Sequence, residues 1–214
     1  MAAVDTAVLA DWVTRFGAAV TDKRDWLTEL DSAIGDADHG ANMARGMGAV
    51  AEKLGAGTPA TVDELLKTVG MTLVSSVGGA SGPLYGTFFL RMGMTAGAVQ
   101  ELDGPGLAAA LRAGLDGIVA RGKAEAGDKT MFDAMAPAVD ALDAALAGGS
   151  SVVDAVRTAA EAAEVGRDAT SPLVARKGRA SYLGERSAGH LDPGAASTAI
   201  LFDTLAAAVA GSAG

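Results

Sequence analysis

Apolar residues recur at helical spacing along nearly the whole chain, and this feature constrains the fold most strongly. Side chains three or four positions apart share one face of a helix, so such a stripe predicts a helix that packs against others. The first stripe contains Val8, Trp12 and Phe16. Further stripes follow within residues 27–34, 43–54, 65–73, 83–92, 107–118, 131–146, 152–156 and 200–209. No alternating pattern of useful length competes, so we expect an all-α fold.

The composition supports close-packed helices. Half of the 214 residues are hydrophobic but only 4% are aromatic, whereas a β-sandwich favours β-branched and aromatic side chains. The links between stripes are mostly short, so sequential helices should run antiparallel. With neither a low-complexity linker nor a convincing repeat, we expect a single domain over residues 1–214.

Charge and cysteine content exclude several function classes. The net charge of −9 argues against general attraction to nucleic acid or to an anionic membrane. The absence of cysteine excludes disulfides, thiol catalysis and cysteine-ligated zinc. No basic segment precedes an apolar one at the start, so we expect no signal peptide and a cytoplasmic location.

One uncharged segment, residues 68–90, is long enough to span a bilayer. It contains five glycines, and four of them are clustered with Pro83 in "SVGGASGPLYG". Glycine and proline punctuate local structure, so we interpret the segment as two helix ends flanking a glycine-rich loop.

Four polar, glycine-rich stretches interrupt the helical pattern, at residues 31–42, 78–86, 121–131 and 175–195. Each joins an even-numbered helical stripe to the next odd-numbered one. In an up-and-down arrangement such loops meet at one end of the bundle. Loops on a rigid scaffold often carry binding residues, so we expect a functional site at that end.

The first of these loops, "DSAIGDADHGAN", offers three carboxylates at Asp31, Asp36 and Asp38. Oxygen ligands suit Mg²⁺, Mn²⁺ or Ca²⁺, and the mutual repulsion of three carboxylates favours a bound cation. If the segment is extended, Asp36 and Asp38 point the same way. His39 is suited to hydrogen-bonding a phosphate, and Asn42 lies near a helix start, which attracts anions. The alternatives are an acidic turn with a helix N-cap and a structural histidine.

Two further loops suggest phosphate contacts. In "GGASGP" the glycines allow backbone N–H groups to approach an anion, and Ser81 adds a hydroxyl. No lysine follows as in a P-loop, and a helix C-cap before a proline-led helix explains the same letters. The fourth loop concentrates basic residues in an acidic protein, where arginine matches phosphate geometry. A solvated surface loop is the alternative. Its basic residues are Arg176, Lys177, Arg179 and Arg186.

An acidic metal cluster, a phosphate-binding loop and a basic loop together suit phosphoryl transfer, which depends on positioning and charge neutralisation. The residues alone do not select the phosphoryl acceptor. A divalent-cation-binding regulatory or adaptor protein is an alternative from a different class, although such a protein does not need the basic loop.

Four motifs carry a resemblance to the DhaL family, the nucleotide-binding subunits of dihydroxyacetone kinases. They are "LTELDSAIGDADHGANM", "SVGGASGPLYGTFF", "RGKAEAGDKTM" and "RKGRASYLGERSAGHLDPGA", and they span residues 27–195. The resemblance implies a barrel of eight antiparallel helices with the nucleotide at one rim. It also implies that Asp31, Asp36 and Asp38 bind two Mg²⁺ ions. The implied nucleotide contacts are His39, Gly40, Ala41, Asn42, Ala80, Ser81, Gly122, Met131, Arg179, Asp192, Pro193 and Gly194.

The resemblance further implies a phosphotransferase reaction that uses phosphoenolpyruvate as the remote donor. ADP is retained as a cofactor, is phosphorylated to ATP by the phosphotransferase-system protein DhaM, and passes the γ-phosphoryl to dihydroxyacetone (glycerone) on the DhaK subunit. The aspartates act through the metals, and Arg179 reaches phosphate. A similar domain in ATP-dependent dihydroxyacetone or other small-sugar kinases exchanges its nucleotide, and this remains an alternative.

Overall fold

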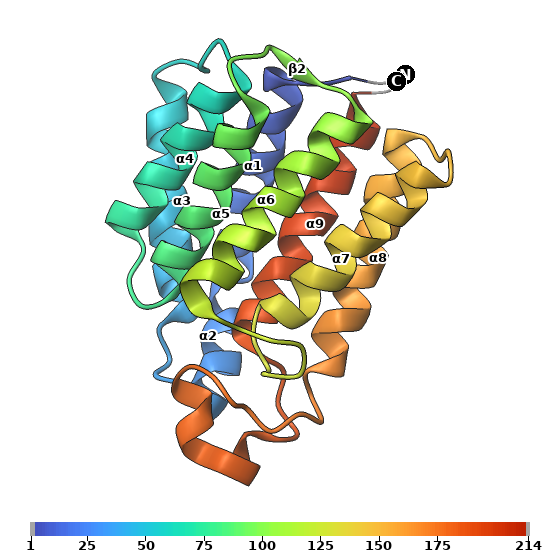
Figure 1. Cartoon of the computed structure of the whole chain (residues 1–214). Helices are drawn as coiled ribbons and strands as arrows, with labels where there is room; N and C mark the ends of the chain where they lie inside the picture. Colours follow the sequence, from blue (N-terminus) through green and yellow to red (C-terminus); the bar gives the residue numbers. More distant parts are fainter. Residues whose placement is uncertain (1–2, 213–214) are drawn as a thin grey trace.

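Nearly all regular structure in the described part of the chain, residues 3–212 of a computed structural model, is helical (Figure 1). The expected all-α fold is therefore confirmed. The α-helices are α1 (Thr6–Asp22), α2 (Arg24–Ile34), α3 (His39–Gly55), α4 (Val62–Ser76), α5 (Ser81–Ala96), α6 (Gly104–Gly122), α7 (Phe132–Ala147), α8 (Val152–Ala169) and α9 (Pro193–Gly211). The remaining elements are a 3₁₀ helix, η1 (Arg179–Ser187), and two short strands, β1 (Val4–Asp5) and β2 (Glu101–Leu102).

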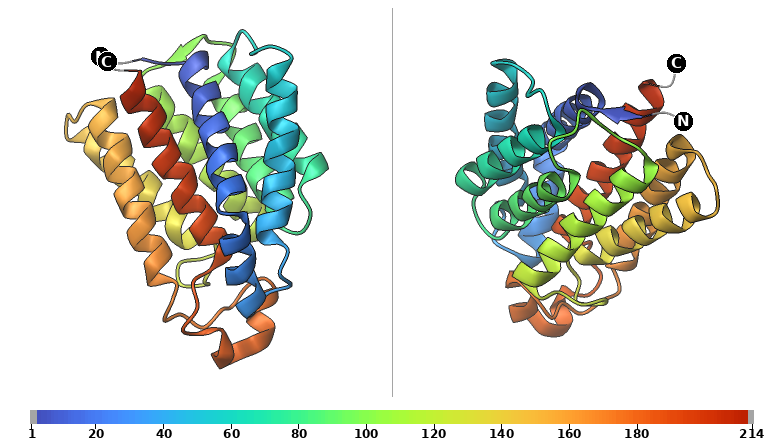
Figure 2. Two further views of the ribbon diagram at one scale, coloured as in Figure 1. Left: turned by 180° about the vertical axis from the view of Figure 1, so that it is seen from behind. Right: turned by 45° about the horizontal axis from the view of Figure 1, so that its top comes forward.

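The helices form a closed antiparallel barrel. From α3 onward each α-helix packs against the next, α1 packs against α3, and α9 returns to pack against α1 (Figures 1 and 2). The expectation that all sequential helices run antiparallel was wrong for α1 and α2. Only Lys23 separates them, and α2 continues in the direction of α1. The nine apolar stripes thus correspond to the helices α1 to α9, which form a barrel and alternate in direction from α2 onward.

Small residues allow the barrel to close tightly. Gly70 of α4 and Gly86 of α5 face each other so closely that a Cβ on either would collide with the backbone of the other. The large apolar side chains of the stripes fill the interior, as their spacing predicts. Trp12 and Phe89, for example, are fully buried with ring centroids 5.5 Å apart.

One end of the barrel is closed by local interactions. Val4 of β1 pairs with Leu102 of β2, and the side chain of Asp5 caps α1 by accepting a hydrogen bond from the backbone N–H of Val8. Aspartate is a favoured N-cap because it satisfies an amide that lacks an intrahelical partner. This end therefore holds short, capped connections.

The glycine-rich loops gather at the opposite end, drawn lowermost in Figure 1. They connect α2 to α3, α4 to α5, α6 to α7 and α8 to α9. Their expected convergence is confirmed. It depends on the alternating direction of helices α2 to α9, which the shared direction of α1 and α2 does not affect. Residues 68–90 are divided between α4 and α5, as interpreted. Within residues 3–212, α9 alone is long and apolar enough to cross a membrane, and 67% of its most apolar stretch is buried inside the protein.

Candidate nucleotide-phosphate site

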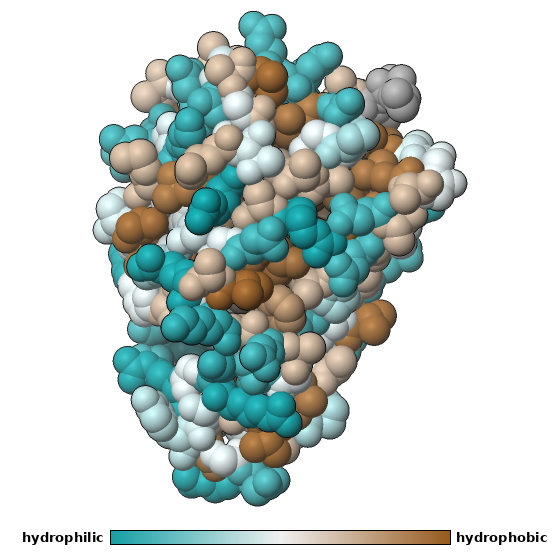
Figure 3. Space-filling view, viewed as in Figure 1, coloured by the Kyte–Doolittle hydropathy of each residue, from teal (hydrophilic) through white to brown (hydrophobic). Residues whose placement is uncertain are grey.

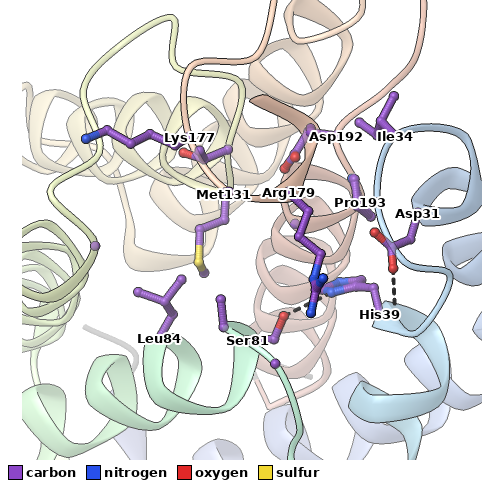
Figure 4. Close-up of a pocket in the computed structure, with 18 of the residues that line it drawn as sticks. Asp31, Ile34, His39, Ser81, Leu84, Met131, Lys177, Arg179, Asp192 and Pro193 are labelled. Atoms are coloured by element: carbon purple, nitrogen blue, oxygen red, sulfur yellow. Dashed lines mark hydrogen bonds between the residues drawn. The ribbon is translucent and has the colours of Figure 1, made fainter. Parts of the chain in front are cut away.

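A cavity of about 300 Å³ lies between the four loops, at the low end of the size range of ligand sites. Figure 4 shows it with Asp31 and His39 on one side, Leu84 and Met131 on the other, and Arg179 between them. The surrounding surface is mostly hydrophilic on the face in Figure 3. Predicted site residues that line the cavity are Asp31, Asp36, Asp38, His39, Ala80, Ser81, Gly122, Met131, Arg179, Asp192, Pro193 and Gly194.

The three aspartates of the first loop converge. Asp31, Asp36 and Asp38 each offer a carboxylate oxygen, and these oxygens lie within 4.8 Å of one another. The segment between Asp36 and Asp38 is not extended, because Ala37 adopts a left-handed conformation with φ of 62°, so the condition under which the two aspartates would point the same way is not met. Such a conformation is uncommon for alanine and marks a constrained turn. The turn, rather than strand-like geometry, brings the carboxylates together.

Asp31 also organises the start of α3. Its Oδ2 accepts hydrogen bonds from the backbone N–H groups of Asp38, at 2.8 Å, and His39, at 3.1 Å. Asp38 is the N-cap residue of α3 by position, but its side chain makes no capping hydrogen bond. Asp31 therefore caps α3 from the neighbouring helix, and the carboxylate of Asp38 stays available to a ligand.

The fourth loop reaches across to the acidic cluster. Arg179 Nε lies 2.8 Å from Asp36 Oδ2, although both side chains are substantially exposed. Lys177 also lines the cavity, whereas Arg176 and Arg186 are exposed and lie outside its lining. The basic loop thus places Arg179 beside the aspartates, and it places Lys177 on the side of the cavity away from Asp31, where each can face an anionic ligand (Figure 4).

His39 belongs to a chain of buried hydrogen bonds. Its Nδ1 lies 3.0 Å from Ser81 Oγ, and its Nε2 lies 2.9 Å from Ser197 Oγ. Burial lowers the pKa of His39, which favours the neutral ring. Ser197 donates to the carbonyl of Gly194, so it accepts from Nε2, and Nδ1 accepts from the hydroxyl of Ser81. Direct contact of His39 with phosphate stays a prediction, and it requires replacement of the bond to Ser81.

The chain of hydrogen bonds continues into the core through Tyr85. Its hydroxyl lies 2.7 Å from Ser197 Oγ and 3.2 Å from Thr198 Oγ1. Burial raises the pKa of Tyr85 to about 12, so this hydroxyl stays protonated. The position of Ser81 at the cavity is therefore linked to α9.

Asp192 and Lys129 lie deeper in the same end. Asp192 caps α9 by accepting a hydrogen bond from the backbone N–H of Ala195 at 2.7 Å. Burial raises the pKa of this carboxyl group to about 7, despite the opposing effects of that hydrogen bond and of Lys129. Lys129 is 1% exposed and lines the cavity.

Sequence reasoning did not single out several lining residues. Lys129 stands in the recognised motif "RGKAEAGDKTM", but nothing in that string marks one lysine as buried. Leu84 and Ile118 form part of the apolar side of the cavity and belong to helical stripes that we interpreted as core. A stripe does not reveal which of its members borders a cavity.

Three expected nucleotide contacts, Gly40, Ala41 and Asn42, are not among the lining residues. Gly40 packs so closely on α2 that a Cβ would collide with the carbonyl of Arg24. Ala41 is exposed, and Asn42 accepts a hydrogen bond from Arg45. Asn42 also packs against Gly78, so its side chain contacts the loop between α4 and α5.

The helical barrel and its cavity, with acidic, hydroxyl and basic groups around one opening, define a phosphotransferase domain of the all-α type. The DAK2 domain family model matches residues 33–207. The chain belongs to this family and, within it, to the DhaL subunits of dihydroxyacetone kinase.

Three relatives illustrate the similarity. The ADP-binding subunit DhaL of the phosphoenolpyruvate-dependent dihydroxyacetone kinase of Escherichia coli is 48% identical over 94% of this chain and 95% of that protein. A D-erythrulose kinase of Mycolicibacterium smegmatis is 35% identical over 88% of this chain but only 33% of its own length. The dihydroxyacetone kinase of C. freundii, crystallised with AMP-PNP and Mg²⁺, has a TM-score of 0.72 and 29% identity, and the chain spans about a third of it (34%).

Proposed function

We propose that this chain is the ADP-binding subunit of a phosphoenolpyruvate-dependent dihydroxyacetone kinase. DhaM phosphorylates the retained ADP, and the γ-phosphoryl then passes to dihydroxyacetone on DhaK to give dihydroxyacetone phosphate. The observation that carries the proposal is that one cavity collects the aspartates of the first loop, Ser81 of the second and Arg179 of the fourth. The higher identity with the E. coli subunit, 48%, than with the D-erythrulose kinase, 35%, supports the subunit type.

The donor set of the first loop fits magnesium. Three carboxylates within 4.8 Å of one another repel, and oxygen ligands are those that Mg²⁺ prefers. The C. freundii relative was crystallised with Mg²⁺ and a nucleotide analogue. We propose that Asp31, Asp36 and Asp38 hold two Mg²⁺ ions, which supply charge neutralisation to the phosphates when bound.

The cavity offers separate places for the parts of a nucleotide. Leu84 and Met131 lie on the side suited to the base or ribose, and Gly122 lies next to Leu84. Ala80 and Ser81, at the start of α5, can donate hydrogen bonds to phosphate oxygens, and a helix start favours anions. Arg179 is suited to neutralising phosphate charge, for which it exchanges its bond to Asp36. No side chain has to act as a covalent nucleophile in this scheme.

The proposal also covers the domain organisation, the cellular location and the partner proteins of this chain. We propose that residues 1–214 act as one domain, in the cytoplasm, with DhaK and DhaM approaching the loop end of the barrel. That end contains the cavity opening, whereas the other end holds the β1–β2 pair.

A reconstitution assay tests the phosphoryl-transfer role. The purified chain is mixed with DhaK, DhaM and the general phosphotransferase proteins, and dihydroxyacetone phosphate is measured with phosphoenolpyruvate or ATP as donor. We expect turnover with phosphoenolpyruvate. Turnover with ATP and DhaK alone identifies the nucleotide-exchanging type of kinase instead.

Two variants separate catalysis from mere cation binding. Asp36→Ala should abolish transfer while helical content is unchanged. Asp11→Ala is the matched control, because Asp11 also pairs with an arginine but lies on the surface of α1. Near-normal transfer by Asp36→Ala favours the adaptor alternative.

Nucleotide retention is tested separately. The protein is desalted extensively, and bound nucleotide is then released by denaturation and quantified. We expect ADP close to one equivalent per chain, whereas an empty or rapidly exchanging site contradicts the retained-cofactor scheme.

A further inference from the structure

In the structure the fourth loop, expected at residues 175–195, is the whole connection between α8 and α9, residues 170–192. It forms one wall of the cavity through Lys177, Gly178, Arg179 and Ala180. Its apolar anchorage is small. Ala175 and Ala180 pack with Ile34 in a cluster separate from the main core. The position of Arg179 therefore depends on how the two ends of the loop are held to the rest of the protein.

Lys129, in the third loop, holds both ends. Its Nζ donates to the carbonyl of Thr170 at 2.7 Å and of Ser171 at 3.4 Å, where the fourth loop begins. It also donates to the carbonyl of His190 at 2.5 Å, where the loop ends. An ammonium group has three N–H donors, so this arrangement uses all of them on main-chain oxygens of one loop.

Neighbouring hydrogen bonds draw the base of the loop together around this lysine. The backbone N–H of Gly189 donates to the carbonyl of Ser171 at 2.8 Å, and that of Asp192 donates to Thr170 Oγ1 at 3.1 Å. The backbone N–H of Arg176 donates to the carbonyl of Asp128 at 3.0 Å. The third and fourth loops are therefore joined at several points, with Lys129 at the centre.

The burial of Lys129 is costly, which argues for a specific use. The ion pairs among residues 3–212 do not include it, and its ammonium group is held by carbonyls alone. Burial lowers the pKa of Lys129 more than the negative charge of nearby Asp192 raises it, so the buried ammonium group carries a desolvation cost. Its backbone is also left-handed, with φ of 64°, which is uncommon outside glycine. Costly features of this kind concentrate at functional sites.

We propose that Lys129 is a positioning residue that ties the two ends of the fourth loop together and thereby sets Arg179 at the phosphate side of the cavity. The inference rests on the proposed nucleotide site and adds to it a residue that does not itself need to touch the nucleotide. Lys129 acts through the main chain of the fourth loop, so its loss is expected to release that loop while the helices stay folded.

The test compares Lys129→Met with Lys123→Met. Lys123 is a matched control because it lies in the same loop and is also left-handed, with φ of 52°, but is exposed. ADP with Mg²⁺ is the probe in isothermal titration calorimetry, and hydrogen exchange is followed by mass spectrometry. We expect Lys129→Met to raise the Kd for ADP about tenfold or more and to speed exchange within residues 172–190, with α1 to α5 unchanged. Lys123→Met should match the wild type.

A double-variant cycle tests the route through Arg179. In an Arg179→Ala background, Lys129→Met should weaken ADP binding less than threefold or so, because residues that act through one another are not additive. Fully additive effects overturn the proposal, as does wild-type ADP binding and exchange in Lys129→Met. Lys129→Gln retains two N–H donors and should recover part of the affinity. If the methionine variant does not fold, the glutamine variant is used for the same comparisons.

The outcomes also distinguish this proposal from that of the nucleotide site. If the site is wrong, the wild type does not bind ADP, or Asp36→Ala binds it normally. If only the role of Lys129 is wrong, the wild type binds, Asp36→Ala does not, and Lys129→Met behaves as the wild type.

Discussion

Asp31 and Asp36 are both proposed magnesium ligands, but the structure predicts that only removal of Asp31 lowers the unfolding free energy appreciably when no metal is present. Asp31 is 7% exposed and caps α3 through two backbone N–H groups, whereas the side chain of Asp36 is 37% exposed and, among residues 3–212, forms an ion pair with Arg179 alone. Loss of two buried, charge-assisted bonds in Asp31→Ala costs about 2–3 kcal/mol. Relief of repulsion within the cluster returns about 1 kcal/mol. The net loss of unfolding free energy is therefore about 1.5 kcal/mol.

For Asp36→Ala the loss of a surface ion pair and the relief of repulsion nearly cancel, which leaves a change within about 0.5 kcal/mol. Urea unfolding in EDTA, followed by circular dichroism, measures both values. Thermal scans should show a fall of about 3–6 °C for Asp31→Ala and little change for Asp36→Ala. Asp31→Asn, which keeps an acceptor oxygen without the charge, should lie between the wild type and Asp31→Ala.

Addition of ADP with Mg²⁺ completes the comparison. Ligand that binds only the folded state raises its stability, so the wild type should gain stability and both alanine variants should gain little. Equal losses for the two variants in EDTA would refute the assignment of Asp31 as the cap of α3. An undiminished gain with ligand in either variant contradicts its role as a metal ligand.

Three further predictions concern the frame around the site. Gly40→Ala should lower the unfolding free energy by about 1–3 kcal/mol, because the added Cβ collides with α2. Gly48→Ala, where the added Cβ meets open space on the same helix, should raise it by about 0.5–1 kcal/mol. Urea unfolding measures both changes. Tyr85→Phe should cost about 1–2 kcal/mol in the same assay because Ser197 loses a buried partner, and an unchanged midpoint contradicts this. The folded pKa of Asp192, about 7, lies above its ordinary 3.8, so its contribution to stability is full below pH 4 and is lost as the pH rises towards 7. Asp192→Asn should remove this slope from unfolding curves measured between pH 4 and 8 in EDTA, and an unaltered slope assigns it to other groups.

The local pattern of the sequence was sufficient for the fold class and for the end of the barrel that carries the site. Apolar spacing follows from the 3.6-residue helical turn, and alternation of helix direction follows from short connections. The predicted reversal between the first two helices was wrong, because a single residue, Lys23, joins two apolar stripes without reversing the direction of the chain. The left-handed turn at Ala37, which brings the carboxylates together, is likewise not predicted by the local sequence, because alanine rarely adopts this conformation.

Residue chemistry likewise identified the aspartates, Ser81 and Arg179 as site candidates. Several of their neighbours in the same motifs, however, do not line the cavity. Gly40 and Asn42 stand beside His39 in the sequence, and the structure turns them towards α2 and the glycine-rich loop instead of the cavity. Successive residues of a helix point in different directions, about 100° apart. Membership of a motif therefore does not establish that a side chain faces the ligand.

The sequence by itself determined the helices, their alternation in direction from α2 onward and the chemical types gathered at one end, because these depend on local spacing and on the identity of side chains. The tertiary structure alone decided that Asp31 caps α3, that His39 bonds Ser81 and Ser197, and that Lys129 ties the ends of the fourth loop. The contacts of His39 and Lys129 join segments that lie far apart in the sequence and that barrel closure brings together, whereas the contact of Asp31 depends on the turn at Ala37. Their distances and burial depend on packing across the whole ring, which spacing along the chain does not encode.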